Sequence, residues 1–434
     1  MESLWTKTSD LPDFPALQED IQTDVLIIGG GITGILCAYL LKQPGVSCVL
    51  AEADRICSGI TKNTTAKITA QHGLIYDKIT RKYGLEKAQM YLSANLDALE
   101  TYRSLCAGIS CNFTPQDAYV YSTTGSAPLE QELEALVKLH YPAEMAVGLD
   151  LPFPTAGAVK FPDQAQFHPL KFLSAIAKDL PIYEHTTIRQ LIGSTALTDT
   201  HRIKARKIIV ATHFPFLNKH GLYFLKQYQH RSYVLALENA RPVNGMFLDQ
   251  ASDGLSFRNW GDLLLLGGGS HRTGKPGGNW EVLEEFAHIH YPGASIRYRW
   301  ATQDCMTLDG IPYIGNYSRN TPDLYVATGF NKWGMTSAMA AAKILTNLVQ
   351  DKDDPCAPVF SPSRSMFHPQ LALNAWEATV NLLTPTPKRC PHMGCALKWN
   401  PQEHSWDCPC HGSRFTFQGK LIDNPAAGDL KNRG

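Results

Sequence analysis

Two apolar periodicities follow one another near the N-terminus. Asp24–Ile28 is an apolar run of strand length, and the apolar positions of Ile32–Leu40 recur at helical spacing. Ser47–Ala51 is a second apolar run of strand length. The uncharged stretch Val25–Leu41 falls just short of a membrane span and has glycines at its centre. The pattern therefore predicts a strand, a turn, a helix and a second strand.

The predicted turn, Gly29–Gly34, reads GGGITG and contains a GxGxxG pattern. Between a strand and a helix this pattern predicts a dinucleotide site, in preference to a structural glycine turn. Gly29 permits the tight turn, Gly31 lets the backbone approach a pyrophosphate, and Gly34 allows the helix to pack closely on the strand. Glu52 ends the second strand, 23 residues after Gly29, and matches the carboxylate that binds the adenosine ribose.

Strand and helix patterns alternate to about residue 350, where the composition changes. Asp351–Ser365 is rich in Pro, Asp and Ser, as linkers are, and a short helical pattern follows at about Pro369–Leu383. The last segment is turn-rich, with β-type residues around Arg414–Ile422. We therefore expect a loosely ordered leader at 1–20, a large α/β unit at 21–350, a linker with a short helix at 351–388 and a small all-β domain at 389–434.

The charge balance excludes two classes of partner. Lys+Arg and Asp+Glu number 40 each, so no charge excess points to nucleic acid or to an anionic membrane surface. The N-terminus lacks the basic start and apolar stretch of a secretory signal, and no membrane span is expected. A cytoplasmic location is the resulting expectation.

A second set of motifs lies near residues 300–336. Leu308–Pro312 reads LDGIP, Ala327–Gly329 reads ATG, and Gly334, Met335 and Thr336 follow. This order resembles the closing FAD-binding region of the D-amino-acid oxidase-like superfamily, which includes glycine and sarcosine oxidases. The resemblance covers about residues 22–350 and implies FAD, a Rossmann-type FAD-binding domain and an interleaved α+β substrate domain. It also implies that four residues lie at the flavin, namely Gly329, Gly334, Met335 and Thr336.

The polar loop Ser58–Gly73 follows the second predicted strand. Flavoproteins of this type often use a Ser/Thr-rich loop here to contact pyrophosphate and flavin, so Thr64, Thr65 and Lys67 are candidates. Lys67 could stabilise negative charge on a reduced flavin ring. A solvated polar loop is an equally weighted alternative.

Four of the eleven cysteines lie within Cys390–Cys410. Clustering at one end of a long chain suggests a metal site rather than a secreted disulfide scaffold. The segments CPHMGC at 390–395 and CPCHGS at 408–413 resemble the two-box signature of Rieske proteins. The resemblance implies a [2Fe–2S] cluster with Cys390 and Cys408 on one iron and His392 and His411 on the other. A structural zinc site with the same ligands is the alternative.

The Rieske resemblance also implies a disulfide between Cys395 and Cys410. Two departures from the family pattern matter. Most of the β-sandwich base that usually precedes the first box is absent, so the small domain is expected to depend on its cluster, its disulfide and docking onto the flavin domain. Phe415 stands where many high-potential members have a Tyr that donates to a ligand sulfur, which predicts a lower potential.

A flavin and a one-electron cluster together predict an FAD-dependent oxidoreductase. The flavin would take two electrons from an amine-like or other small metabolite, and the cluster would pass them singly to a redox partner. A dehydrogenase is therefore favoured over a simple oxidase. The alternatives are an electron-transfer or redox-sensing protein without a small-molecule substrate, and a plain oxidase with a structural metal.

The catalytic residues are not identified by any motif. Amino-acid oxidases of this type often place an Arg before the LDGIP-like motif to clamp the substrate carboxylate, but this chain has Asp304 and Cys305 there. Cys305 could also attach FAD covalently, as a Cys in this region does in some sarcosine oxidases. Weak candidates for acid, base or cation are His72, His271 and Arg258, with His213, Arg272 and Arg299 as further possibilities.

Overall fold

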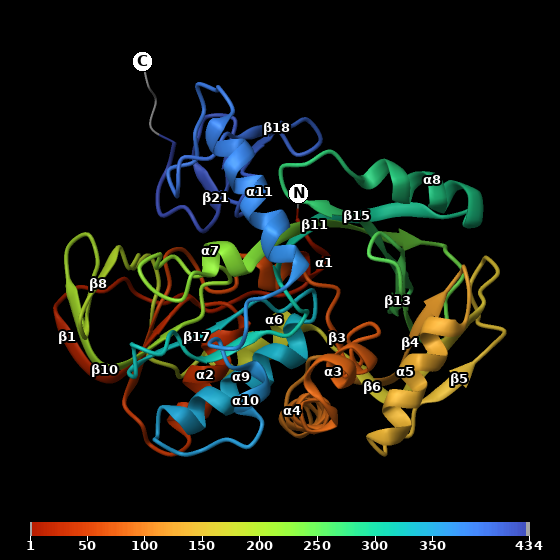
Figure 1. Cartoon of the computed structure of the whole chain (residues 1–434), viewed down its shortest axis with the longest axis horizontal. Coiled ribbons are helices and arrows are strands. Elements are labelled where there is room, and N and C mark those ends of the chain that lie inside the picture. Colours follow the sequence, from red (N-terminus) through yellow and green to blue (C-terminus); the bar gives the residue numbers. More distant parts are fainter. Residues whose placement is uncertain (1, 431–434) are drawn as a thin grey trace.

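The computed structural model describes residues 2–430 and places the glycine turn in an eight-stranded sheet (Figure 1). The turn joins β1 (Ile21–Ile28) to α2 (Ile32–Lys42). Val25 and Ile27 of β1 belong to one hydrophobic cluster, and Leu26 and Ile28 belong to another, because both faces of the strand are covered. β1 pairs in parallel with its two neighbours, as predicted for a Rossmann-type unit. The other strands of this sheet are β2 (Cys48–Ala51), β7 (Ile182–Tyr183), β8 (Gln190–Ile192), β9 (Thr195–Leu197), β10 (Arg202–Val210), β16 (Tyr313–Asn316) and β17 (Leu324–Thr328).

The second sheet has nine mostly antiparallel strands, in the order β15-β11-β14-β13-β12-β4-β6-β3 with β5 paired to β6. Its strands come from chain segments that lie between those of the first sheet, which confirms the interleaved domain. It is separate from the first sheet, and the two meet across the cavity described below. Its strands are β3 (Lys67–Ile68), β4 (Thr114–Ser122), β5 (Glu144–Ala146), β6 (Gly157–Gln166), β11 (Gln227–Glu238), β12 (Met246–Asp249), β13 (Ser256–Trp260), β14 (Leu263–Arg272) and β15 (Ser295–Thr307).

The C-terminal segment forms a small antiparallel sheet that lies over β11 and α7 in Figure 1. Its four strands are β18 (Lys398–Asn400), β19 (Ser405–Asp407), β20 (Arg414–Thr416) and β21 (Leu421–Asp423). A hydrophobic cluster of only a few buried residues supports it, including Phe415 and the four cysteines. The small all-β domain is thus confirmed, and its core is too small to stand without support from its neighbours.

The helices surround the two large sheets. The longest is α4, and none among the described residues is long and apolar enough to cross a membrane. The helices are α1 (Leu4–Lys7), α2, α3 (Tyr76–Tyr83), α4 (Leu85–Cys106), α5 (Ala127–Lys138), α6 (Pro169–Ala177), α7 (Tyr223–Lys226), α8 (Trp280–His290), α9 (Gly334–Leu348), α10 (Ala357–Phe360) and α11 (Pro369–Leu383), with a short 3₁₀ helix at Ile60–Asn63.

Two segments expected to be loose are packed. The N-terminal leader contributes Leu4 and Trp5 to the main core, and the Trp5 indole donates to the carbonyl of Thr64. In the predicted linker, α10 buries Val359 and Phe360 in the same core. The sequence expectation missed these contacts because single buried aromatic residues leave no periodic signal. The predicted helix at about Pro369–Leu383 is confirmed as α11.

Candidate functional site

A cavity of about 1520 Å³ lies where the three sheets meet. The first sheet contributes Gly29, Gly31 and Glu52 to its wall, and the loop before α9 contributes Gly329, Gly334 and Met335. The second sheet contributes residues of β11, β14 and β15, and β21 of the C-terminal domain closes one end. Such a volume is large enough for a dinucleotide together with a small molecule.

The glycine turn has the geometry that the sequence predicts. Gly29 has a φ of +110°, and a Cβ on it would lie 2.7 Å from the carbonyl oxygen of Ala211. A Cβ on Gly34 would collide with the carbonyl oxygen of Gly29, so this residue permits close packing of α2 on β1. Gly31 is the N-cap of α2 and lines the cavity. The cavity therefore meets a helix N-terminus, whose N–H groups and dipole favour a phosphate.

Glu52 lies at the end of β2 and faces the cavity. Its carboxylate accepts hydrogen bonds from the backbone N–H groups of Gly30 and Asp54. Burial raises its pKa, and the backbone donors act against that rise. A carboxylate held at this strand end is suited to accept hydrogen bonds from a ribose.

The polar loop after β2 also reaches the cavity. Thr64, Thr65 and Lys67 line it, as expected for a flavin-contacting loop. The Lys67 ammonium donates to the carbonyl of Phe247 at 3.0 Å. Burial, with a contribution from Arg258, lowers the pKa of Lys67 to about 7. This lysine would gain a proton readily if a negative charge formed beside it.

Thr336 is the exception among the predicted flavin-contacting residues, because it does not line the cavity. Its hydroxyl donates to the carbonyl of Thr69 at 2.9 Å and lies 2.9 Å from Nε2 of His72. The hydrogen bond to Thr69 connects the first turn of α9 to the residue that follows β3. Its predicted contact with the cofactor is therefore not supported.

The strands β11 and β15 present two opposite faces, because side chains alternate along a strand and directly paired residues share a face. We call inner face the cavity-lining set, which comprises Tyr228, His230, Ser232, Thr302, Asp304 and Met306. We call outer face the opposite set, which comprises Gln229, Arg231 and Gln303. Tyr233 follows an irregularity in the pairing of β11 with β14; it lines the cavity and its hydroxyl also donates to Glu403 at 3.3 Å. The inner face meets the first sheet across the cavity, and the outer face meets the C-terminal domain.

The outer face holds the predicted cluster loops directly. Gln229 Nε2 donates to the carbonyl of His411 at 3.0 Å, and Gln303 Nε2 donates to the carbonyl of Gly412 at 2.8 Å. At the end of β14, Arg272 Nε donates to the carbonyl of Pro409 at 3.1 Å. These donors bind backbone carbonyls of the second cluster box, so they fix its position without occupying the ligand side chains.

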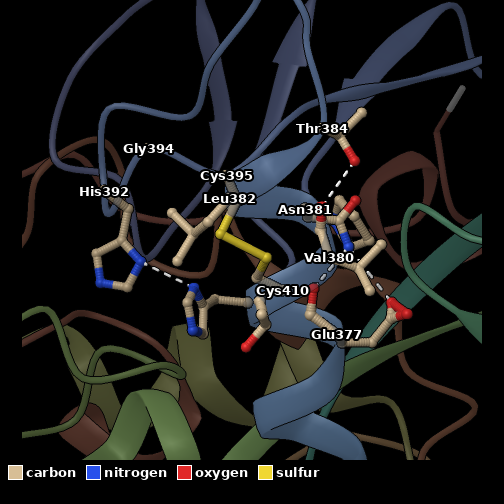
Figure 2. The surroundings of a disulfide bond; sticks show 12 residues. Glu377, Val380, Asn381, Leu382, Thr384, His392, Gly394, Cys395 and Cys410 are labelled. Carbon is tan, nitrogen blue, oxygen red and sulfur yellow. Dashed lines mark hydrogen bonds between the residues drawn. A yellow bond between two sulfur atoms is a disulfide. The ribbon is translucent and has the colours of Figure 1, made fainter.

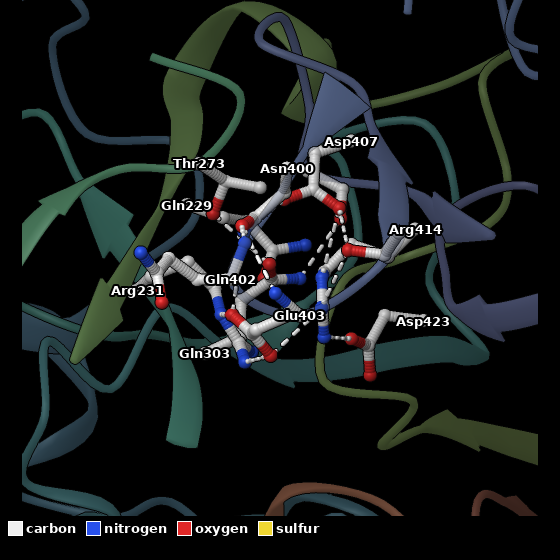
Figure 3. A network of polar contacts seen from close by, with 12 residues as sticks. Gln229, Arg231, Thr273, Gln303, Asn400, Gln402, Glu403, Asp407, Arg414 and Asp423 are labelled. Carbon is white, nitrogen blue, oxygen red and sulfur yellow. Dashed lines mark hydrogen bonds and ion pairs between the residues drawn. The ribbon is translucent and has the colours of Figure 1, made fainter. Parts of the chain in front are cut away.

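A buried charge network fastens the rest of the domain (Figure 3). Arg231 of the outer face pairs with Glu403, which also pairs with Arg414 at 2.8 Å. Arg414 continues to Asp407 at 3.0 Å and to Asp423 at 3.1 Å. Burial opposes ionisation of Glu403, but the two arginines outweigh it and lower its pKa. The network thus joins β11 to three strands of the C-terminal sheet, β19, β20 and β21, and to the loop that carries Glu403.

The four predicted cluster ligands converge at the tip of this domain. His392 and His411 place their Nδ1 atoms 3.3 Å apart. The thiol of Cys408, the hydroxyl of Ser413 and backbone N–H groups all donate toward Cys390, and together, despite burial, they lower its pKa to about 7. Burial lowers the pKa of His392 to about 4 and of His411 to about 3. Neutral imidazoles beside a thiol that ionises readily form a donor set that fits a Rieske cluster.

Cys395 and Cys410 form a disulfide that joins the two cluster loops (Figure 2). It lies beside α11, where Leu382 also approaches (Figure 2). The sulfur atoms of Cys395, Cys408 and Cys410 lie close enough together to suggest a metal site. Two of these three are already joined to each other, so only Cys408 remains available as a ligand.

The weak catalytic candidates are mostly engaged elsewhere. Arg258 does not line the cavity, because it is buried between Trp5 and Trp260 with its guanidinium 5.4 Å from each ring. His271 also lies outside the cavity and stacks on Tyr233. The structure gives no support to a catalytic role for either residue, because neither side chain lines the cavity and both pack on aromatic rings. The sequence could not reveal this, because Trp5 is far from Arg258 along the chain and Tyr233 is far from His271.

His72 does line the cavity, but its ring is held at both nitrogens. Nδ1 lies 2.6 Å from the Tyr91 hydroxyl, and Nε2 lies 2.9 Å from the Thr69 carbonyl. Burial lowers the pKa of His72 to about 3, so the ring is neutral. Arg272 serves in docking, and Arg299 pairs with Glu284 at the surface.

Comparison with known proteins agrees with this geometry. Residues 24–348 match the FAD dependent oxidoreductase family, and residues 376–433 match the Rieske [2Fe-2S] domain, which here reaches back into α11. A Rieske 2Fe-2S iron-sulfur protein of Bacillus subtilis, YhfW, is 38% identical over 493 aligned positions that cover 99% of this chain and 97% of the relative.

Two further proteins resemble the flavin part. The gamma-glutamylputrescine oxidoreductase of Escherichia coli is 24% identical over 78% of this chain and 86% of its own length. The crystal structure of glycine oxidase from Geobacillus kaustophilus superposes with a TM-score of 0.65 at 19% identity, covering 79% of this chain and 99% of that one. This chain therefore belongs to the FAD-dependent oxidoreductase family and carries a C-terminal Rieske [2Fe–2S] domain.

Proposed function

We propose that this protein oxidises an amine-like small molecule at its flavin and exchanges the electrons with the Rieske cluster of the same chain. The observation that carries this proposal is the two-faced sheet: the inner face of β11 and β15 lines the flavin cavity, and the outer face holds His411 and Gly412 of the cluster box. The two sites are separated by the thickness of one sheet.

The residues assigned to each cofactor follow from this arrangement. FAD would be held by Gly29, Gly31 and Glu52 at its dinucleotide end, and by Gly329, Gly334 and Met335 together with Thr64, Thr65 and Lys67 at its flavin end. The cluster would be held by Cys390, His392, Cys408 and His411. Bound FAD supplies a two-electron acceptor, and the bound cluster supplies a one-electron centre.

The amine-like substrate is supported by the relatives. The E. coli relative is named for an amine substrate, gamma-glutamylputrescine, and the Geobacillus structure is that of an enzyme named for glycine. We assign a redox partner to the cluster because electrons that reach it must leave the chain. Dehydrogenase action, in which the partner rather than oxygen is the acceptor, and a cytoplasmic location remain predictions.

A covalent link between Cys305 and FAD has little support. Cys305 is 1% exposed, and burial raises its pKa to about 12, so the thiol is not ionised at neutral pH. Acid denaturation should release flavin into the supernatant, where its absorbance is measured. Flavin that stays on the precipitated chain would establish the link.

The test of electron exchange needs no substrate. The holoprotein is reduced anaerobically with substoichiometric dithionite, and the flavin is followed by absorbance while the cluster is followed by EPR. Reducing equivalents that redistribute between the two centres, with a Rieske-type EPR signal, would support the proposal. A zinc-containing, EPR-silent protein would overturn it.

The alternative of an electron-transfer or sensing protein without a substrate makes a different prediction. Anaerobic addition of a panel of small amines would then leave the flavin absorbance unchanged. Bleaching of the flavin by any one amine, followed by the cluster signal, would instead identify a donor.

A further inference from the structure

One carboxylate on the inner face has no partner within the protein. Asp304 lies on β15 directly opposite His230 of β11, and both line the cavity. Among the residues 2–430 that the structure describes, no hydrogen bond or ion pair reaches the carboxylate of Asp304. Burial raises its pKa, while nearby Lys332, His213 and Arg231 act against that rise. The side chain of Asp304 is half-buried and faces the cavity. A carboxylate that is partly removed from water and has no hydrogen-bond partner gains stability when a ligand supplies one.

The cations near Asp304 are engaged by other groups. The Lys332 ammonium donates to the Ser270 hydroxyl at 2.8 Å, and that hydroxyl lies 2.9 Å from the hydroxyl of Ser232. Arg231 points to the outer face, where it pairs with Glu403. Neither cation contacts the carboxylate of Asp304 directly, so a cationic group of a ligand in the cavity can do so.

The same wall lacks a clamp for a carboxylate. Bidentate recognition of a carboxylate needs a guanidinium, and none of the cavity-lining residues described on β11, β14 and β15 is an arginine. Lys332 lies in the loop between β17 and α9, whereas Lys67 belongs to β3 of the second sheet and donates to the carbonyl of Phe247. This part of the cavity therefore offers a carboxylate with no direct partner among the described residues, and two lysines whose ammonium groups are held by neutral oxygen atoms of the protein.

We propose that Asp304 is the counter-ion for the ammonium group of the substrate, and that the substrate class is an alkylamine that needs no carboxylate beside its nitrogen. This inference rests on the proposed function, because it assigns a substrate class to the same cavity. Asp304 acts in binding and specificity, and no bond is made or broken in the step assigned to it.

The test uses three probes of one shape that cannot be oxidised, because the carbon next to their polar groups carries no hydrogen. They are tert-butylamine as the cation, pivalate as the anion and 2-aminoisobutyrate as the zwitterion. Each is titrated into the oxidised holoprotein, and the Kd is obtained from the flavin difference spectrum and from calorimetry. We expect tert-butylamine to bind most tightly.

The variant Asp304→Asn removes the charge and keeps the shape. It should raise the Kd of tert-butylamine at least about tenfold, because a hydrogen bond to a charged group is lost. Asp249→Asn is the matched control: Asp249 lines the same cavity, but its carboxylate already accepts the N–H of Ala251. It should change the Kd by less than about twofold. Flavin content and the Tm of each variant verify that it is folded.

Each contrary outcome is decisive. An unchanged Kd in Asp304→Asn, or tighter binding of pivalate than of tert-butylamine, would overturn the counter-ion role. Tighter binding of 2-aminoisobutyrate than of tert-butylamine would show that a carboxylate is recognised as well and would overturn the substrate class. Dithionite-driven exchange between flavin and cluster does not involve these probes, so a failure here is distinguishable from a failure of the proposed function.

Discussion

The inner and outer faces of β11 and β15 differ in how their polar groups are satisfied. On the outer face, Gln229, Arg231 and Gln303 all find partners in the C-terminal domain. On the inner face, Asp304 has no partner among the described residues, and a ring nitrogen of His230 is also unpartnered. Complete satisfaction is typical of a permanent contact, and incomplete satisfaction is typical of a site that waits for a ligand. The contrast separates a docking surface from a binding surface on one sheet.

The largest expected effect comes from removing a cluster ligand. Cys408 is fully buried on the outer-face side, and Cys408→Ser should abolish the Rieske EPR signal of the reduced protein while the flavin content stays unchanged. Iron and sulfide analysis gives the matching stoichiometry. Cys356→Ser, at a cysteine remote from the boxes, is the control and should keep the signal. A cluster signal in Cys408→Ser would contradict the ligand assignment.

Breaking the charge network should weaken the attachment of the C-terminal domain to the outer face and leave the flavin domain folded. Arg414→Met leaves the buried Asp407 without its cation, removes the partner of the half-buried Asp423 and leaves Glu403 with Arg231 alone, which should lower the free energy of unfolding by about 3–5 kcal/mol. Denaturant unfolding is followed by cluster absorbance and by flavin fluorescence. The control Arg299→Met breaks a surface pair with Glu284 and should cost no more than about 1 kcal/mol.

Arg414→Met could move the flavin transition as far as the cluster transition. The flavin domain and the C-terminal domain would then unfold as one unit, and the two faces would not differ in their contribution to stability. If only the cluster transition moved, the docking surface would be an independent layer.

Acid should loosen the same contact. The pKa of Glu403 is lowered in the folded state, so its contribution to stability is present above the ordinary Glu pKa of about 4.3 and is lost as pH falls through the lower folded value. Denaturant unfolding between pH 7 and pH 3 measures this loss. Glu403→Gln should lower stability at pH 7 and flatten the pH dependence. An equally steep loss in that variant would assign the acid sensitivity to other carboxylates.

The smallest expected effect concerns single docking donors. Gln229→Leu leaves the carbonyl of His411 without its 3.0 Å donor and should lower stability by about 1 kcal/mol. Gln303→Leu removes the donor to Gly412 instead and should cost a similar amount. Because only Gln229 contacts a ligand residue, the EPR line shape should change in Gln229→Leu alone. Identical spectra would show that the two donors act only in docking.

The local motifs could be predicted from the sequence, because each depends on a few neighbouring residues. The turn at Gly29–Gly34 needs a strand before it and a helix after it, and both lie within twenty residues. The cysteine and histidine boxes are equally local. The helix Pro369–Leu383 was also predictable, although its orientation was not: Asn374 and Asn381 are buried while Trp376 is 67% exposed. In an amphipathic helix the apolar side chains usually face the core and the polar ones face solvent, and α11 has the opposite arrangement at these positions.

The contacts that were missed are long-range. Arg231 and Glu403 are 172 residues apart, and no spacing rule connects them. Residue type and position in the sequence placed three residues at the flavin site, namely Thr336, Arg258 and His271. Their side chains do not line the cavity, because each is held by another residue of the protein. The signal that could have found the docking surface was the pair Gln229 and Arg231, which are long polar residues at alternate positions of a buried strand.

The alternation along β11 also limits how the length of this strand can change. A one-residue insertion between Gln229 and Arg231 would rotate every later side chain to the opposite face. Arg231 would then point toward the flavin cavity, and the residue before it would take its place opposite Glu403. Deletion of one residue there would likewise turn Arg231 toward the cavity, and Ser232 would take its place opposite Glu403. The binding surface and the docking surface can therefore be altered independently by substitutions, but a change of strand length by a single residue would damage both at once.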